Sequence, residues 1–167
     1  MRVLGIDPGL TRMGIAVVER TDGALRPIAM GVIRTSTDLP VAKRLVELRR
    51  QLLEALETSE PDVVAVERLF FNSNVRTAMS VGQASGVAIE TAAEAGLEVH
   101  DYTPGQVKAS VVGVGNATKA QVQAMVAAIL GLSTPPRPAD AADACALAIC
   151  HHNSSGLARA VSRAVGG

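Results

Sequence analysis

Aromatic side chains are almost absent from this sequence. Among its 167 residues there is no Trp, one Tyr and only two Phe. Hydrophobic residues nevertheless make up 48% of the chain, which is enough to bury a core of ordinary size and argues against a disordered protein. The core must therefore be aliphatic, and the adjacent pair Phe70 and Phe71 stands out.

Long apolar runs are missing too. No stretch is apolar for long enough to cross a bilayer, and the opening segment MRVLGIDPGL does not have the pattern of a signal peptide. We therefore expect a cytoplasmic protein with no membrane partner. Cys145 and Cys150 lie on different faces of one predicted helix, so we expect two buried thiols and no disulfide between them.

Net charge is also absent, since 16 basic residues balance 16 acidic ones. Proteins that bind nucleic acids are often basic, so the balance weighs against such a partner. A metal site that uses several carboxylates would change this conclusion, because the remaining surface would then be basic.

The apolar periodicity predicts one mixed α/β domain. Short apolar runs bounded by turn residues predict strands over residues 2–7, 13–19, 27–35, 62–67 and 97–102. Helices are predicted over residues 40–56, 75–95, 104–111, 117–131 and 138–152. The first three strands form an antiparallel meander, and the order of elements indicates a single sheet covered by helices. We expect residues 1–156 to form the domain and residues 157–167 to form a short C-terminal tail that frays.

Four acidic residues have positions that predict a shared site. Asp7 and Glu67 each end a short apolar strand, and ligands of open α/β sheets bind beyond the carboxyl ends of strands. Asp140 and Asp143 are three residues apart at the start of the last predicted helix, so both point the same way. A helix that carried them to the same rim would gather four carboxylates.

Such a cluster needs a cation. Two unit charges about 4 Å apart repel by roughly 4 kcal/mol at an effective dielectric constant near 20. Oxygen ligands favour hard divalent ions such as Mg²⁺ or Mn²⁺, and paired ions suit phosphodiester hydrolysis. Taken singly, a strand-end aspartate more often forms a turn, and Asp140 is well placed to cap a helix. Asp143 lies too far into the helix for capping to explain it.

Several segments together resemble the RuvC family of bacterial Holliday junction resolvases. These segments are GIDPGLTRMG (5–14), VAVERLFF (64–71), VGQASGVAI (81–89), GQVKASVVGVGNATKAQVQAMV (105–126) and ADAADACALAI (139–149). They occur in the family's order from residue 1 to about residue 152. The resemblance implies an RNase H-like fold, in which a three-strand antiparallel meander and further parallel strands form a mixed central sheet with helices on both faces.

The resemblance also implies the reaction. Family members are homodimers that nick two opposing strands of a four-way DNA junction during recombination and repair, together with branch-migration proteins of the RuvAB type. The residues that match the family's catalytic, Mg²⁺-binding acids are Asp7, Glu67, Asp140 and Asp143. We expect two ions in each active site, with Mn²⁺ able to replace Mg²⁺. Lys108 and Lys119 match lysines that the family places near the scissile phosphate.

The segment after Glu67 is a candidate DNA contact. Two adjacent aromatic residues cannot both face one core, so at least one of Phe70 and Phe71 should be exposed. The resemblance implies that Phe70 stacks on a base near the junction centre, a contact worth about 1–3 kcal/mol, and Phe71 is the second candidate. Arg68 and Arg76 flank these residues and are candidates for phosphate contacts.

Small residues along the helix at 75–95 suggest a place for dimerisation. They are Gly82, Ala84, Ser85, Gly86 and Ala88. The RuvC family dimerises partly through the corresponding helix, so we expect the interface there. The other interpretation is that the small residues let the helix pack tightly on its own sheet.

Besides a general RNase H-like nuclease that acts on another branched or hybrid substrate, two other functions remain open at this point. The segment GIDPGLT also resembles the first phosphate loop of sugar-kinase and actin-like ATPases, although the second domain of that fold has no counterpart in this sequence. A non-catalytic junction-binding protein is the second alternative. Nicking that depends on a metal ion would separate both from a resolvase.

Overall fold

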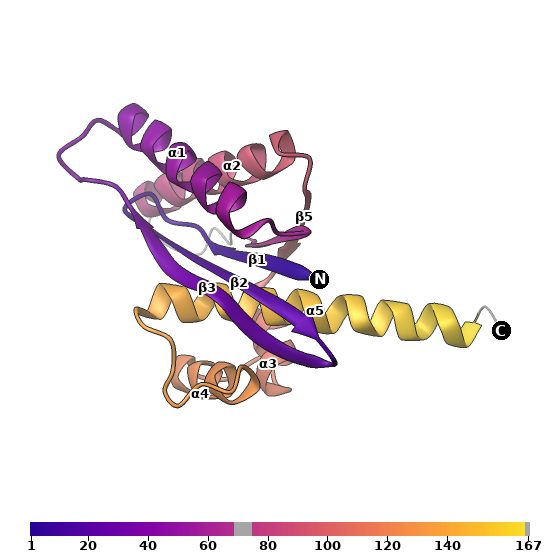
Figure 1. The fold of residues 1–167 in the computed structure, drawn as a ribbon. Helices are drawn as coiled ribbons and strands as arrows, with labels where there is room; N and C mark the ends of the chain where they lie inside the picture. The colour runs from indigo at the N-terminus through magenta and orange to yellow at the C-terminus, as the bar shows by residue number, and fades with distance from the viewer. Residues whose placement is uncertain (69–74, 166–167) are drawn as a thin grey trace.

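A computed structural model describes the backbone of residues 1–68 and 75–165, and the side chains of residues 1–68 and 78–156. The strands are β1 (Arg2–Asp7), β2 (Arg12–Thr21), β3 (Ala24–Arg34), β4 (Val63–Glu67) and β5 (Glu98–Tyr102). The helices are α1 (Val41–Ser59), α2 (Val75–Glu94), α3 (Pro104–Val112), α4 (Lys119–Ile129) and α5 (Ala139–Val165). Figure 1 shows their arrangement.

The strands form one mixed sheet in the order β3-β2-β1-β4-β5. Strands β1, β2 and β3 pair in antiparallel fashion, whereas β4 and β5 run parallel to β1. The meander followed by parallel strands, predicted from the sequence, is therefore confirmed. Strand β1 lies at the centre and β4 beside it, so two of the predicted site acids lie on neighbouring strands.

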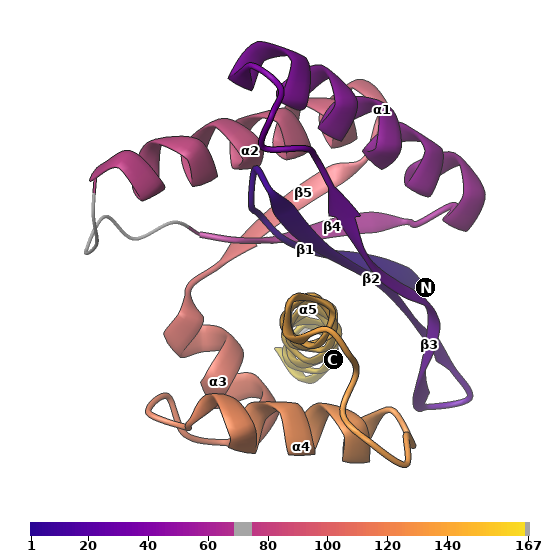
Figure 2. The same ribbon diagram turned by 90° about the vertical axis from the view of Figure 1, so that its left-hand side faces the viewer.

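Helices cover both faces of the sheet. In Figure 2, α1 and α2 lie on one face, α5 runs along the other, and α3 and α4 lie beyond α5. The alternation of side chains along β1 divides the core accordingly. Leu4 and Ile6 pack with α1 and α2, whereas Val3 packs with α5. Each face of the sheet thus has its own aliphatic core.

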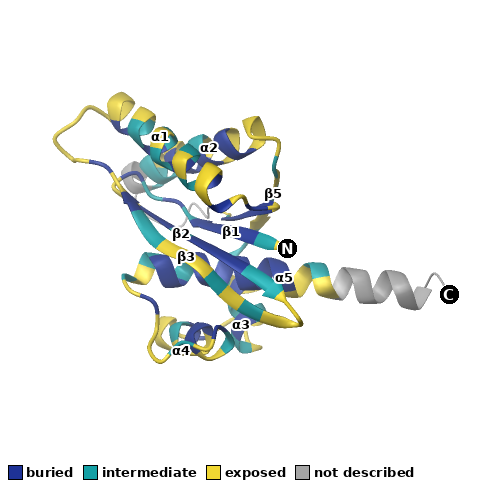
Figure 3. Cartoon of the chain, in the orientation of Figure 1, coloured by how far each residue is buried: buried dark blue, intermediate teal, exposed yellow. Residues whose placement is uncertain are grey.

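Helix α5 is buried on every side along much of its N-terminal half, as Figure 3 shows. Residues 144–152 are all buried, because the sheet covers one side of the helix and α3 and α4 cover the other. This position explains why residues 144–150 are apolar with no polar face. Cys145 and Cys150 lie in this stretch as buried free thiols, as predicted.

Two glycines let α5 lie directly on the sheet. A Cβ atom at Gly5 of β1 would be 2.0 Å from the carbonyl oxygen of Ala144. A Cβ atom at Gly14 of β2 would be 2.0 Å from the carbonyl oxygen of Asp140. Atoms cannot approach that closely, so the absence of side chains on these strands fixes where α5 and its acids lie.

The C-terminal helix differs from the sequence-based expectation. It was expected to end at residue 152, yet α5 continues to Val165. The division into a domain over residues 1–156 and a fraying tail over residues 157–167 stays a prediction. Throughout the ranges that the structure describes, no helix combines the length and the apolar character that crossing a bilayer requires.

Candidate active site

Asp7 and Glu67 lie side by side on the α5 face of the sheet. Gly5 of β1 pairs with Ala65 of β4 in the parallel ladder. Gly5 contacts α5, and Ala65 belongs to the core on the α5 side. Side chains two residues apart on a strand point to the same face, so both acids point towards α5 from the ends of their strands.

Helix α5 brings the other two acids to the same place. It begins at Ala139, with Asp140 in its first turn. The backbone of Asp140 lies against Gly14, and Gly14 pairs with Asp7 across the antiparallel ladder. Asp143 follows one turn later on the same face of the helix.

The four carboxylates line one cavity of about 400 Å³. Lys108 of α3 and Lys119 of α4 line it as well. The apolar part of its wall comes from Pro104, Val107, Val122, Ala146 and Leu147. The structure thus brings together the four predicted catalytic acids and the two lysines that the resemblance places near the scissile phosphate.

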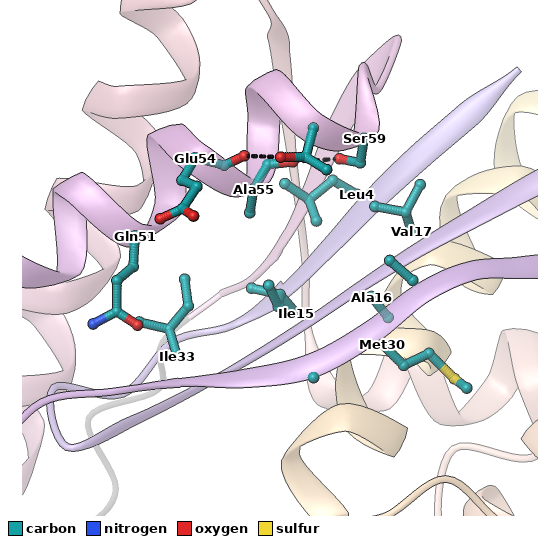
Figure 4. Close-up of a pocket in the computed structure, with 13 residues that line it drawn as sticks. Leu4, Ile15, Ala16, Val17, Met30, Ile33, Gln51, Glu54, Ala55 and Ser59 are labelled. Atoms are coloured by element: carbon teal, nitrogen blue, oxygen red, sulfur yellow. Dashed lines mark hydrogen bonds between the residues drawn. The ribbon is translucent and has the colours of Figure 1, made fainter.

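A second cavity, shown in Figure 4, lies between α1 and the meander and measures about 310 Å³. Aliphatic residues such as Leu4, Ile15 and Ile33 make up most of its lining, with Gln51 and Glu54 among the few polar groups. The predicted catalytic residues do not line it. This cavity is therefore not an alternative candidate for the active site.

Asp7 is the acid whose ionised form the cavity disfavours most clearly. Burial raises the pKa of Asp7 to about 7, and the charges of Glu67, Asp143 and Asp140 add to this effect. Burial also raises the pKa of Glu67, with the charge of Asp143 as the next cause. Without a bound cation the cavity therefore holds more carboxylate charge than it can stabilise.

Lys119 supplies part of the opposing charge from inside the cavity. Its Nζ donates a hydrogen bond of 2.6 Å to Oδ2 of Asp143, and this bond is the main cause of the raised pKa of Lys119. Lys119 is the first residue of α4. Thr118 and Gln121 form a capping box at this end of the helix, which holds the backbone of Lys119 in place.

Arg12 supplies the second opposing charge, and the sequence analysis did not foresee it. Its Nε and Nη2 donate hydrogen bonds of 2.8 Å and 2.6 Å to Oδ2 of Asp140. The two residues are 128 positions apart in the chain. Spacing along the sequence carries no signal for such a contact, which exists only because α5 crosses the start of β2.

The acids fit a divalent metal ion by their chemistry. All four are carboxylates, and burial first, then the charges of the other three acids, raise the pKa of Asp7, so a cation beside it would be stabilising. As the side chains stand in the described part of the chain, no three of its His, Cys, Asp or Glu residues could hold a common ion. The four acids surround the cavity and do not meet at a single point, and one oxygen of Asp143 is engaged by Lys119.

The candidate DNA contacts are only partly described. Arg68 forms an exposed ion pair with Asp101 of β5, and its backbone N–H donates to the carbonyl of Tyr102 at 2.8 Å. The candidate for a phosphate contact is thus already paired with a carboxylate. Phe70 and Phe71 lie outside the described residues, as does the side chain of Arg76, so their DNA contacts stay predictions.

The small residues of α2 divide between its two faces. Ala84, Ser85 and Ala88 are buried within the chain, where the two alanines pack in the core beneath α1 and α2. Their small size therefore serves packing inside one subunit. Gly86 is exposed, and Met79 and Ile89 are 62% and 42% exposed.

Comparisons with known proteins agree with this arrangement. A family model described as "Crossover junction endodeoxyribonuclease RuvC" matches residues 3–151, a range that contains every acid of the cavity. The protein of that name from Salinispora arenicola is 55% identical over 171 residues, covering 98% of this chain and 97% of that protein. Its counterpart from Mycobacterium ulcerans is 53% identical over 152 residues, covering 90% of this chain and 83% of that protein. The structure of Thermus thermophilus RuvC in complex with Holliday junction substrate superposes with a TM-score of 0.89 at 39% identity, covering 95% of this chain and 96% of that chain.

Proposed function

This chain belongs to the RuvC family of crossover junction endodeoxyribonucleases, and from that premise we propose how its own residues perform the reaction. It has the RNase H-like fold and is a Holliday junction resolvase, a nuclease of DNA recombination and repair. The ATPase alternative is not favoured, because the match to the resolvase family runs from residue 3 to residue 151.

Four carboxylates that line one cavity with two lysines carry the proposal. Asp7, Glu67, Asp140 and Asp143 are the catalytic acids, and they would hold two Mg²⁺ ions, with Mn²⁺ able to substitute. The chemistry that such ions supply when bound is an activated water and stabilisation of the leaving 3′-oxygen. The chain's own contribution is to hold the four carboxylates on β1, β4 and α5 at one end of the sheet.

The two lysines would contact the phosphate that is cut. Lys119 is suited to this role because its side chain is 61% exposed although it pairs with Asp143. Lys108 enters the same cavity from α3. Positive charge beside the scissile phosphate stabilises its electron-rich transition state and adds affinity for the DNA backbone.

Two subunits would act on one junction. A homodimer with two-fold symmetry matches the approximate two-fold symmetry of a four-way junction and places one active site on each opposing strand. We propose the exposed face of α2 as the interface, Phe70 as the residue that stacks on a base, and branch-migration proteins of the RuvAB type as partners. We place this activity in the cytoplasm.

A comparison of the wild type with Asp143→Asn tests the active site. On a labelled four-way junction with Mg²⁺, the wild type should make paired, symmetric nicks, and it should make none without the metal or on linear duplex. The variant should still bind the junction, but its nicking rate should fall by about 100-fold or more, the scale of losing one electrostatic contact in a transition state. Asp22→Asn, in an exposed turn, is the matched control.

Each other outcome has its own meaning. If Asp143→Asn cuts as fast as the wild type, Asp143 is a structural residue and the proposed site is wrong. If neither protein cuts the junction and both bind it, the chain is a non-catalytic junction-binding protein.

A further inference from the structure

Arg12 is attached to one of the four acids in a specific way. Two of its nitrogens, Nε and Nη2, donate to the same oxygen of Asp140, Oδ2. Charge-assisted hydrogen bonds of this kind are stronger than neutral ones, and only the planar guanidinium offers two donors in fixed geometry. In the part of the chain that the structure describes, we find no hydrogen bond to the other oxygen of Asp140, Oδ1.

The position of Arg12 separates it from Lys119. Lys119 and Asp143 both line the acidic cavity. Asp140 lines the cavity as well, but Arg12 does not. Arg12 therefore holds Asp140 from outside and leaves the cavity open to an ion.

The backbone beneath Arg12 is held firmly. The hydroxyl of Thr11 accepts a 2.6 Å hydrogen bond from Nη2 of the buried Arg44. The carbonyl of Thr11 accepts a bond from the N–H of Thr35 at 3.3 Å. A Cβ atom at Gly9 would lie 2.1 Å from the carbonyl oxygen of Arg12, so the turn after Asp7 packs against Arg12 itself. A residue on such a rigid base is suited to orient another side chain.

We propose that Arg12 is a positioning residue, which turns Asp140 so that Oδ1 faces a divalent cation in the cavity. The inference rests on the proposed function, because it assumes that Asp140 is a metal ligand. Carboxylates that bind metals are commonly held by such an outer hydrogen bond, and the loss of one typically costs about 10–100-fold in metal affinity or activity. Arg12 would thus act through Asp140 and touch neither the ion nor the DNA.

Through its charge alone, Arg12 would weaken metal binding rather than strengthen it. A cation beside the cavity repels a metal ion, so a bystander arginine would weaken metal binding through its charge. Replacing Arg12 by lysine keeps the charge and removes the two-pronged hydrogen bond. The lysine variant therefore separates orientation from charge.

The test is a titration of Mn²⁺ into the DNA-free protein, followed by isothermal calorimetry or by the electron paramagnetic resonance signal of free Mn²⁺. We expect Arg12→Lys to lower the affinity for Mn²⁺ by about 10-fold. Arg34→Lys is the matched control and should leave the affinity unchanged. Arg34 lies opposite Arg12 in the β2–β3 ladder, and it takes part in none of the ion pairs found among the described residues.

Thermal unfolding without metal completes the test. If Arg12 only ties β2 to α5, Arg12→Lys lowers the melting temperature and leaves the affinity for Mn²⁺ unchanged, and the inference is wrong. Affinity equal to or higher than that of the wild type overturns it as well, whatever the stability.

A titration of Asp7→Asn distinguishes this failure from failure of the proposed function. A wild type that binds no more Mn²⁺ than Asp7→Asn overturns the metal site and this inference together. A wild type that binds Mn²⁺ well, alongside an Arg12→Lys variant of equal affinity, overturns the inference alone.

Discussion

At the scale of single residues, the burial and charge of the site act most clearly on the pKa of Asp7. Its pKa rises from 3.8 to about 7 in the folded protein, first because it is buried and then because three acids surround it. Between these two values the folded chain holds a proton that the unfolded chain has lost. Without metal, the stability contributed by Asp7 is therefore complete below about pH 4 and is lost as the pH rises through about 7.

Asp7→Asn should remove this pH-dependent loss. At about pH 8 in the presence of a chelator, the variant should be more stable than the wild type by on the order of a few kcal/mol, because the amide carries no charge to bury. The advantage should shrink as the pH is lowered towards about 4. Urea or thermal unfolding at two pH values measures it.

Two comparisons make this prediction specific. Asp22→Asn is the control, since Asp22 lies in an exposed turn with a φ of 52°, a conformation that asparagine tolerates. Added Mg²⁺ should raise the melting temperature of the wild type more than that of Asp7→Asn, because a ligand stabilises the state that binds it. A variant less stable than the wild type at about pH 8 would contradict the charge argument.

The residues of the site differ in how far the sequence could predict them. Asp7 and Glu67 could be predicted from their positions at the ends of apolar strands. The pair on α5 could be predicted from its helical spacing. The assignment of the two lysines depended on the family resemblance, because surface lysines are common. Arg12 could not be predicted, since its contact with Asp140 depends on how α5 crosses the sheet.

The contact between α5 and β1 is the decisive feature at the scale of elements. A methyl group at Gly5 would meet the backbone carbonyl of Ala144, which cannot rotate away as a flexible side chain can. Gly5→Ala should therefore push α5 off the sheet and lower the free energy of unfolding by about 1–3 kcal/mol. Nicking should fall as well, because Asp140 and Asp143 move with the helix.

Gly31→Ala on β3 provides the comparison. Both glycines are in strands, but a Cβ atom at Gly31 would have no neighbour within 4 Å. This control should change the unfolding free energy little, and urea unfolding of both variants measures the difference. Equal stability of the two variants would show that α5 does not lie on β1 as described.

The sequence predicted where most elements occur and, through the family resemblance, the mixed sheet that they form, but it did not predict the register shift within β2 or the end of α5. Strands and helices were found because their apolar periods differ, and the meander because a turn joins its strands. The shift in register between Val17 and Val18 of β2 could not be predicted. Pro27 lies opposite Val18, but a proline within a strand fits a regular edge strand as well as a bulge, so it does not indicate which of the two is present. The extension of α5 to Val165 was also missed, because the Ser-Ser-Gly segment at residues 154–156 is typical of a helix end.

The acidic cavity and the proposed dimer interface are separate features at the scale of the whole molecule. Figure 2 shows α2 on the face of the sheet opposite α5, with α3 and α4 beyond α5. The acidic cavity lies on the α5 side. The exposed face of α2 carries two large apolar side chains, Met79 and Ile89. Pairing through this face would leave the acidic cavities of both subunits open to DNA.

Ile89→Glu tests this assembly, because a charge in the centre of an apolar interface must be buried without a partner. We expect a homodimer for the wild type and a rise in its dissociation constant of about 10-fold or more for the variant. Sedimentation velocity over a range of concentrations measures both. Met125→Glu is the matched control, since Met125 is 38% exposed on α4, on the other side of the molecule.

The junction reaction adds a second measurement of the same variant. A weakened dimer should still cut, but its two nicks should become uncoupled, so single-nicked junctions should accumulate at low protein concentration. Met125→Glu should keep the paired nicks of the wild type. If Ile89→Glu remains as dimeric as Met125→Glu, or if the wild type itself sediments as a monomer, the α2 interface is wrong. The packing of Ala84 and Ala88 within one subunit would then account for the small residues of α2 without any partner.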